Sequence, residues 1–280
     1  MDIISFLLGY TSGKKGGGSS EAIVEPLTVT KNGTYIPGAG VDGFAPVSVA
    51  VESGGGSCGD DIIASGVFAS GVTWKLDSNG IFTVSGTGAM DDYTSEEERP
   101  WNDVADQIRA VVIEKGVTHI GSYAFAGGRI RAVYLHQTIR NDGVLLNDGA
   151  VQSIGDRAFL GLHAHGIVLP QGLKTIGNYA FSGSHLYGIE FPYSVTDIGD
   201  GVFQLCTNLR YAKFGSNVAS IGKAAFYLAS NMSNAKFSDT STWYVGDNAG
   251  DTTTAVAVTS ETTAATYLTS TYVAKYWTKV

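Results

Sequence analysis

The stretch Ile176-Gly177-Asn178-Tyr179-Ala180-Phe181 is one of five copies of a motif in which isoleucine and glycine precede two variable residues, a small residue and phenylalanine. Successive copies begin 34, 22, 22 and 23 residues apart, at Ile120, Ile154, Ile176, Ile198 and Ile221. A period in this range is typical of a solenoid, in which each repeat buries its apolar face only against its neighbours. The motif therefore predicts a mainly β solenoid.

The isoleucine and the phenylalanine of each copy are predicted to stack, repeat upon repeat, into a buried apolar spine. The glycine is expected to permit a tight or left-handed turn, and the small residue leaves room for the phenylalanine ring. The predicted spine consists of Ile120, Phe125, Ile154, Phe159, Ile176, Phe181, Ile198, Phe203, Ile221 and Phe226.

Between the motifs, apolar residues recur in pairs separated by one position, which predicts one strand of a parallel sheet per repeat. Both members of a pair face inward, because side chains alternate along a strand. The pairs are Val111/Ile113, Val133/Leu135, Ile167/Leu169, Ile189/Phe191, Ala212/Phe214 and Ala235/Phe237. The predicted exposed face consists of Ala110, Val112, Ala132, Tyr134, Gly166, Val168, Gly188, Glu190, Tyr211, Lys213, Asn234 and Lys236.

The chain has 280 residues, of which 44% are hydrophobic and 16% charged, with a formal net charge of −8. This acidic balance disfavours nucleic acid and anionic membranes as partners. The two cysteines, Cys58 and Cys206, suggest no disulfide framework, and the spacing of Cys206 from its apolar neighbours predicts a core position. The apolar patch Ile3–Leu8 lacks a preceding basic segment, so no secretory signal is expected.

Two glycine tracts at 16–18 and 54–56 read as linkers and divide the chain. Five segments are predicted: an N-terminal anchor and linker (1–20), a small β module with a glycine linker (21–56), a β-hairpin cap (57–107), the repeats (108–240) and a C-terminal cap (241–280). Trp74 and Trp101 are expected to anchor the first cap. A four-residue period from Ala264 to Tyr276 predicts a short helix in the second, with Trp277 helping to seal that end.

The longest interval between motifs carries an insertion that runs from Arg140 to Gly149 and contains two turn signals. It predicts a protruding hairpin or loop, and such an insertion is a candidate recognition element. Aromatic and charged side chains also suit the binding of glycans or proteins, although they can equally be ordinary strand positions. The candidate binding residues are Tyr134, Glu190, Tyr211, Lys213 and Lys236 on the sheet, with Arg140, Asn141 and Asp142 in the insertion.

Catalytic motifs are not found in the sequence, and we expect neither an enzyme nor a cofactor or metal. The acidic run Glu96–Glu98 is interpreted as a solvated loop. The segment Asp247–Asp251 is too incomplete for a calcium loop. The five histidines follow no zinc-ligand spacing and are interpreted as surface or turn residues where they occur as His163-x-His165.

The repeats resemble the BspA-type leucine-rich repeats. The segments Val117–Gly121 and Val195–Gly199 carry that resemblance, together with Leu169-Pro170 and Phe191-Pro192. It extends over roughly residues 57 to 240, and the opening of such proteins resembles the segment from Trp74 to Val117. The resemblance implies an adhesin of bacterial surfaces or virions without catalysis. The longest interval departs from the family period, so no contacts there are carried over.

Residues 27–49 are similar to a short module of tail proteins from phages that infect Gram-positive bacteria, and Tyr267–Trp277 is similar to the ends of phage-encoded repeat proteins. This similarity implies a virion tail or baseplate protein that attaches to a host glycan or protein. The patch Ile3–Leu8 would then dock on other tail proteins or on further copies of this chain. The alternative is a bacterial cell-surface or secreted adhesin of the same repeat family.

Overall fold

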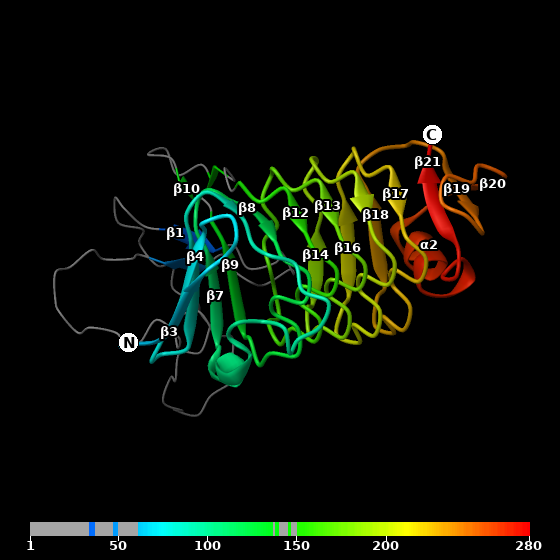
Figure 1. Ribbon diagram of the computed structural model, residues 1–280. Coiled ribbons are helices and arrows are strands. Elements are labelled where there is room, and N and C mark those ends of the chain that lie inside the picture. The colour runs from blue at the N-terminus through cyan, green and yellow to red at the C-terminus, as the bar shows by residue number, and fades with distance from the viewer. Residues whose placement is uncertain (1–33, 37–46, 50–60, 137, 140–144, 147–149) are drawn as a thin grey trace, which may run out of the picture.

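The computed structural model describes residues 34–36, 47–49, 61–136, 138–139, 145–146 and 150–280. The repeats lie side by side in one stack, and each turn of chain contributes short strands on opposite sides of a common core (Figure 1). The N-terminal sheet lies at one end of the stack, and α2 with strands β19, β20 and β21 lies at the other.

One side of the stack is a ladder of the motif isoleucines. Each belongs to a two- to four-residue strand, and these strands pair in parallel so that the isoleucines are direct neighbours. All five are buried. The strands are β8 (Val117–Ile120), β12 (Ser153–Ile154), β13 (Thr175–Ile176), β15 (Asp197–Ile198) and β17 (Ser220–Ile221), with β6 (Gly88–Ala89) next to β8.

Hydrogen bonds run between repeats in both directions within the motif. The N–H of Gly177 donates to the carbonyl of Ile154 in the preceding repeat at 2.8 Å. The N–H groups of Tyr179 and Phe181 donate forward, to Asp200 at 2.8 Å and Val202 at 3.0 Å. The copies that begin at Ile154 and Ile198 repeat this pattern, so each inner motif satisfies its backbone with both neighbours.

Of the tight or left-handed turn predicted at the motif glycine, the left-handed alternative is wrong. None of these five glycines, all within the described residues, has a positive φ. A Cβ on Gly222 would instead lie 2.4 Å from the carbonyl carbon of Gly199, so glycine is required because neighbouring backbones approach closely. The left-handed residue follows two positions later and is non-glycine in four of five copies: Tyr123, Arg157, Tyr179, Gly201 and Ala224.

The first variable position of the motif carries a second ladder, made by side chains. Oδ1 of Asp156 accepts from the N–H of Asn178 at 2.7 Å. Oδ1 of Asn178 accepts from Asp200, and Oδ1 of Asp200 accepts from Lys223, both at 2.8 Å. The position that sequence alone shows as variable is therefore restricted in the middle repeats to residues that can accept a hydrogen bond.

The motif phenylalanines form one continuous column of stacked rings. The rings of Phe159 and Phe181 lie 5.4 Å apart and those of Phe181 and Phe203 5.5 Å apart, with interplanar angles of 7° and 4°. At the N-terminal end the column continues from Phe125 into Trp101, whose Nε1 donates to the carbonyl of Ala124 at 3.2 Å. All ten residues predicted for the spine are buried.

The opposite side of the stack consists of two sheets. The first has the order β3-β4-β5-β7-β9, with β3 (Ile62–Val67), β4 (Thr73–Asp77) and β5 (Ile81–Ser85) antiparallel and β7 (Ala110–Ile113) and β9 (Ala132–Leu135) added in parallel. The second is parallel and consists of β14 (Gly188–Glu190), β16 (Tyr211–Phe214) and β18 (Asn234–Phe237).

The single parallel sheet predicted from the apolar pairs is therefore divided. Residues Gly166–Leu169, which are described, form no strand. Ile167 and Leu169 are buried as predicted, but alternation determines only the direction of side chains. A ladder also needs neighbouring backbones at hydrogen-bonding distance and in register.

The predicted exposed face is also interrupted, because Ala110 and Gly188 are buried. Ala110 lies between Ile81 and Ala132 in register, so neighbouring strands flank it. Gly188 lies beneath the ring of Tyr211, because a Cβ there would come within 2.0 Å of that ring. Small side chains on this face are covered by their neighbours.

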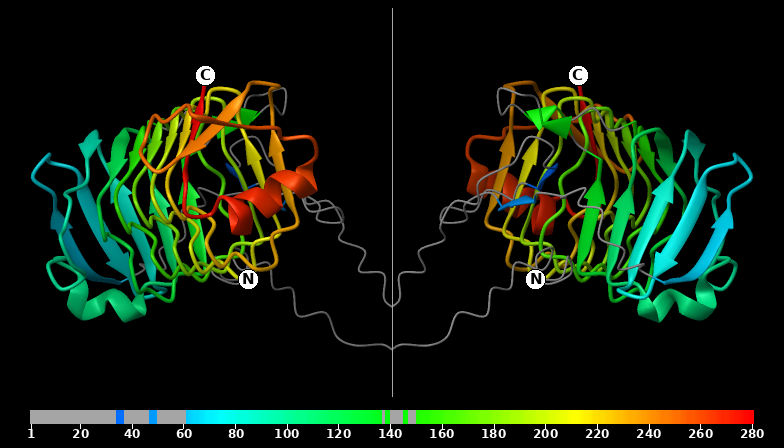
Figure 2. Two further views of the ribbon diagram at one scale, coloured as in Figure 1. Left: turned by 90° about the vertical axis from the view of Figure 1, so that its right-hand side faces the viewer. Right: turned by 90° about the vertical axis from the view of Figure 1, so that its left-hand side faces the viewer.

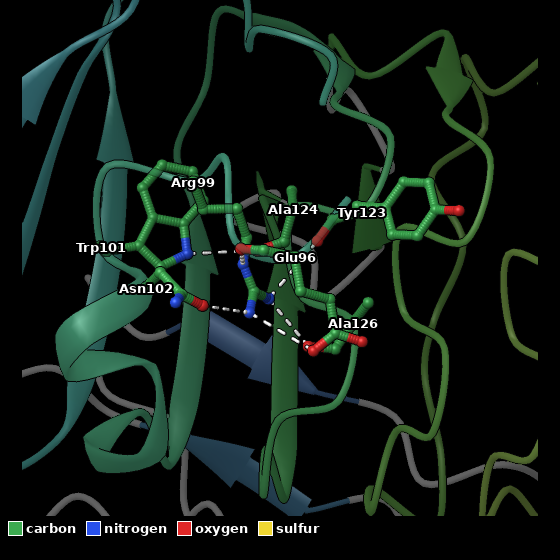
Figure 3. Close-up of polar contacts among 7 residues, drawn as sticks. All are labelled: Glu96, Arg99, Trp101, Asn102, Tyr123, Ala124 and Ala126. Atoms are coloured by element: carbon green, nitrogen blue, oxygen red, sulfur yellow. Dashed lines mark hydrogen bonds and ion pairs between the residues drawn. The ribbon is translucent and has the colours of Figure 1, made fainter. Parts of the chain in front are cut away.

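A buried arginine joins the N-terminal unit to the first motif (Figure 3). The Arg99 guanidinium donates to the carbonyl of Ala126 at 2.8 Å and to Oδ1 of Asn102 at 3.2 Å, and pairs with Glu96 at 3.5 Å. Burial lowers the pKa of Arg99, and the charge of Glu96 opposes this effect. Glu97 and Glu98 are exposed, as expected for a solvated loop, whereas Glu96 is partly covered and also pairs with this buried cation. The short helix η1 (Asn102–Gln107) follows.

The insertion begins as a hairpin, in which β10 (Thr138–Ile139) pairs with β11 (Leu145–Leu146). Arg140, Asn141 and Asp142 lie outside the described residues. In the predicted N-terminal module, β1 (Thr34–Ile36) pairs antiparallel with β2 (Val47–Val49). The anchor, both glycine linkers and Cys58 lie outside the described residues.

The C-terminal segment packs against the last repeat, with α2 in front of the end of the stack (Figure 2, left). The helix predicted to reach Tyr276 ends earlier, because β21 (Tyr276–Lys279) pairs antiparallel with β17 and places Trp277 opposite Ile221. This pairing satisfies backbone groups and overrides the four-residue apolar period. The remaining elements are β19 (Trp243–Gly246), β20 (Thr254–Val256), α2 (Glu261–Thr266) and the π-helical turn η2 (Tyr267–Thr271).

Replacing Phe181 by Ala is expected to lower the free energy of unfolding by about 3–5 kcal/mol, because the side chain leaves a cavity inside the ring column. Denaturant unfolding followed by circular dichroism measures the effect. Phe181→Leu is the matched control, since it keeps most of the apolar volume and is expected to cost less. An unchanged midpoint for Phe181→Ala would contradict the role of the column.

Two substitutions in one motif distinguish the two reasons for which a position can favour glycine, close approach of a neighbouring backbone and a left-handed conformation. Gly222→Ala is expected to destabilise the protein, because its Cβ would overlap the backbone of Gly199. Ala224→Gly, at a φ of 56°, is expected to raise the free energy of unfolding by about 0.5–1 kcal/mol, because glycine adopts this conformation without steric cost. Thermal melts of both variants test the pair, and destabilisation by Ala224→Gly would refute the assignment.

Candidate binding surface

Three of the predicted binding residues form one row across the parallel sheet. The strand register makes Glu190, Lys213 and Lys236 direct neighbours on β14, β16 and β18. Lys213 pairs with Glu190 at 3.2 Å, and Lys236 pairs with Glu261 of α2 at 3.5 Å. All three side chains are exposed, and each lysine has an acidic partner, one within the row and one on α2.

Tyr211 belongs to the same sheet but is half-buried. Its ring covers Gly188, and among the described residues its buried hydroxyl has no hydrogen-bond partner. Burial, with the charge of Glu190, raises the pKa of Tyr211. Its ring face is therefore engaged in packing rather than open to a ligand.

Tyr134 lies on β9 in the other sheet and is also half-buried. Its register partner is Val112, so the structure does not bring it into the row of Glu190, Lys213 and Lys236. The sheet candidates therefore occupy two separate surfaces.

A basic edge, which sequence reasoning missed, borders the sheets where the chain enters β9, β14 and β16 (Figure 1). Its inner row comprises Arg131, Tyr187 and Arg210, which directly precede β9, β14 and β16. His165 occupies the equivalent position in the repeat between β9 and β14 and completes the row. Its outer row, two residues earlier in the repeat, comprises Arg129, His163 and His185. All seven are exposed except Tyr187, which is half-buried. Aligning this one repeat position would have revealed the inner row.

The side chains of the basic edge are stacked in register. The imidazole rings of His163 and His185 lie 4.6 Å apart, and the rings of His165 and Tyr187 lie 4.7 Å apart, both nearly parallel. Cζ of Arg210 lies 5.9 Å from the centre of the Tyr187 ring. Backbone hydrogen bonds from Tyr187 to His165 and from Arg210 to Tyr187, at 2.9 and 2.8 Å, hold these residues on successive repeats.

Aromatic and cationic side chains also occupy the left-handed position of the motif. Cζ of Arg157 lies 5.4 Å from the ring centre of Tyr123 and 4.9 Å from that of Tyr179. These contacts are within the range of cation–π interactions. Because Arg157 is held between two rings, its guanidinium face is already occupied.

The groups with chemical reactivity have structural partners. The thiol of Cys206 is buried as predicted, lies 3.1 Å from the carbonyl of Phe181, and has its pKa raised by burial to about 11. His119 contacts Asp92 at 3.1 Å and Ser153 at 2.7 Å. The described residues contain no group of three or more potential metal ligands, and none of the described helices has the length and apolarity needed to span a bilayer.

Comparison with known proteins gives a family and several solved structures. The model of the BspA type leucine rich repeat region matches residues 104–143 and 144–252 in six copies. No curated protein sequence gives a significant match. A leucine-rich repeat protein of Eubacterium ventriosum is 28% identical with a TM-score of 0.55, over 64% of this chain and 46% of that protein. The matched region thus spans less than half of that protein's length.

More distant structures include the leucine-rich repeat protein of T. pallidum, 18% identical over 57% of this chain and 87% of that protein, with a TM-score of 0.36. A leucine rich cell surface protein of Faecalibacterium prausnitzii is 16% identical over 64% of this chain and 77% of that protein, with a TM-score of 0.21. The family match spans more than half of the chain and agrees with the stacked parallel strands. The chain belongs to the BspA-type leucine-rich repeat family.

Proposed function

We propose that this chain is a non-enzymatic adhesin that binds a cell-surface glycan or protein through its repeats. The observation that carries the proposal is the contrast between a constant buried motif and chemically varied exposed rows. The row Glu190–Lys213–Lys236 and the basic edge both present charged groups at fixed repeat positions. Display of varied side chains on a repeated scaffold is how solenoid proteins form extended binding surfaces.

The first candidate location is a bacterial cell surface or the extracellular medium. The resemblance to BspA-type repeats implied adhesins, and membership of that family supports this location. The exposed rows offer charged and aromatic side chains to a partner, which supports a binding role.

The second candidate is a virion tail or baseplate protein that attaches to the host. Its specific support is the similarity of residues 27–49 to phage tail modules, together with the apolar patch Ile3–Leu8 as a docking segment. In this case the partners are other tail proteins at the N-terminus and the host surface at the repeats. Both candidates assign the same binding role to the repeats.

We also infer that the end units close the repeat stack. At the C-terminal end, the carbonyl of Val273 accepts from the N–H of Ala224 at 2.8 Å, where each earlier motif uses the following repeat. At the N-terminal end, Trp101 and Arg99 contact the first motif. Such closure protects the apolar spine from water at both ends.

The binding role predicts that fluorescently labelled protein attaches saturably to intact bacterial cells and is displaced by unlabelled protein. Flow cytometry over a panel of species measures the attachment. Heat-unfolded protein serves as the control, because it has the same composition and charge but lacks the folded surface. Absence of saturable attachment to every species would overturn the proposal.

Antibodies against the chain separate the two locations. Detection in the cell envelope or medium without virus particles supports the cellular adhesin. Detection by immunogold labelling on purified phage tails supports the virion component.

A further inference from the structure

We propose that the basic edge binds an acidic polysaccharide, whose sulfate, phosphate or carboxylate groups contact Arg129, Arg131, Arg210 and the neighbouring histidines. This proposal rests on the adhesin function and names its ligand class and site. The edge differs from the sheet row considered above, because its charges are all of one sign.

The arginines of the edge are not neutralised by the protein. Among the described residues, no carboxylate forms an ion pair with Arg129, Arg131 or Arg210. Most lysines of the sheet and C-terminal region, by contrast, have acidic partners, as Lys213 and Lys236 do. An arginine presents several N–H donors in a plane, which suits bidentate contact with sulfate, phosphate or carboxylate.

The charged neighbours of His163 are also cationic. Burial and the charges of His185, Arg131 and Arg129 lower the pKa of His163. An anion bound beside His163 would offset the neighbouring cationic charges, and titratable groups shifted by such neighbours are common at functional sites. A chain with a net charge of −8 thus carries a local positive surface.

The spacing of the edge favours a polymer over a single small anion. The ring pairs His163/His185 and His165/Tyr187 are separated by 4.6 and 4.7 Å, close to the distance between neighbouring strands. Four successive repeats contribute to the inner row, so it extends over roughly 14 Å at that strand spacing. Donors repeated along a line match charges repeated along an extended chain.

An acidic polysaccharide fits this edge better than nucleic acid does. Proteins that bind single strands stack the bases on open aromatic faces. Here the rings of His165 and Tyr187 stack on each other, and Arg210 lies over Tyr187.

The test compares dextran sulfate with unsubstituted dextran, which share a backbone and differ in charge. Biolayer interferometry with immobilised full-length protein is expected to show saturable binding of dextran sulfate only, weakening as salt rises. The triple variant Arg129→Gln, Arg131→Gln, Arg210→Gln is expected to weaken binding by at least about tenfold, since it removes three charge-assisted contacts.

The control variant Lys75→Gln, Lys174→Gln, Lys223→Gln removes the same charge from exposed positions away from the edge. It is expected to change the affinity by less than about twofold if contact rather than net charge matters. Equal loss in both variants, or no binding of dextran sulfate, would refute the proposal. A single-stranded DNA oligonucleotide that binds the edge more tightly than dextran sulfate would refute the ligand class.

A second measurement uses the unaltered protein and does not depend on how variants fold. NMR titration of the histidine side chains with sucrose octasulfate is expected to raise the pKa of His163, because a bound anion stabilises the imidazolium. An unmoved His163 would refute the site. If the arginine variant still attaches to cells as the unaltered protein does, the edge assignment fails while the adhesin function stands.

Discussion

The close approach of neighbouring backbones at the motif glycine is the constraint on which the repeat stack depends. A Cβ on Gly155 would lie 2.5 Å from the backbone nitrogen of Ser122, so any larger residue would separate the repeats. At that distance the glycine N–H reaches the preceding isoleucine carbonyl, and the isoleucines fall into direct register. The phenylalanine rings then stack at nearly constant spacing. The apolar spine is therefore a consequence of backbone approach as well as of hydrophobic burial.

The same constraint explains where the repeats stop. Each side-chain acceptor of the second ladder receives an N–H from the following repeat, until Lys223 occupies the position. An ammonium group has donors and no acceptor, so it cannot extend this ladder. The C-terminal segment follows here, with Val273 accepting the N–H of Ala224 and Trp277 paired with Ile221. At the last motif, a lysine thus replaces the side-chain acceptor, and the C-terminal segment replaces the following repeat as the hydrogen-bond partner.

Sequence periodicity could predict the buried residues because burial depends on the direction of side chains, which the repeat makes visible. It could not show that Gly166–Leu169 form no strand, since strands depend on distances between backbones. The role of the glycine was misjudged for a related reason: tight turns and close approach both require glycine, and only the φ values separate them. Arg99 was not recognised because its partners, from Glu96 to Ala126, belong to different units. On the candidate surface, the register of Glu190, Lys213 and Lys236 was predictable, whereas the covering of Gly188 by Tyr211 was not.

In a repeat scaffold, similar residues at one position of successive repeats form a row on the surface. Because neighbouring strands are about 4.8 Å apart, like charges at equivalent positions lie closer together than isolated surface charges usually do. In the sheet row, alternation of Glu190 with Lys213 turns this proximity into attraction. In the basic edge, arginines and histidines turn it into repulsion, which adds to the effect of burial in lowering the pKa of His163. The ring column and backbone ladders stabilise the stack independently of either row, so the scaffold can hold a destabilising row in place. An anion bound as proposed would gain affinity by relieving this repulsion, so a stable repeat scaffold can support a site that would be unfavourable by itself.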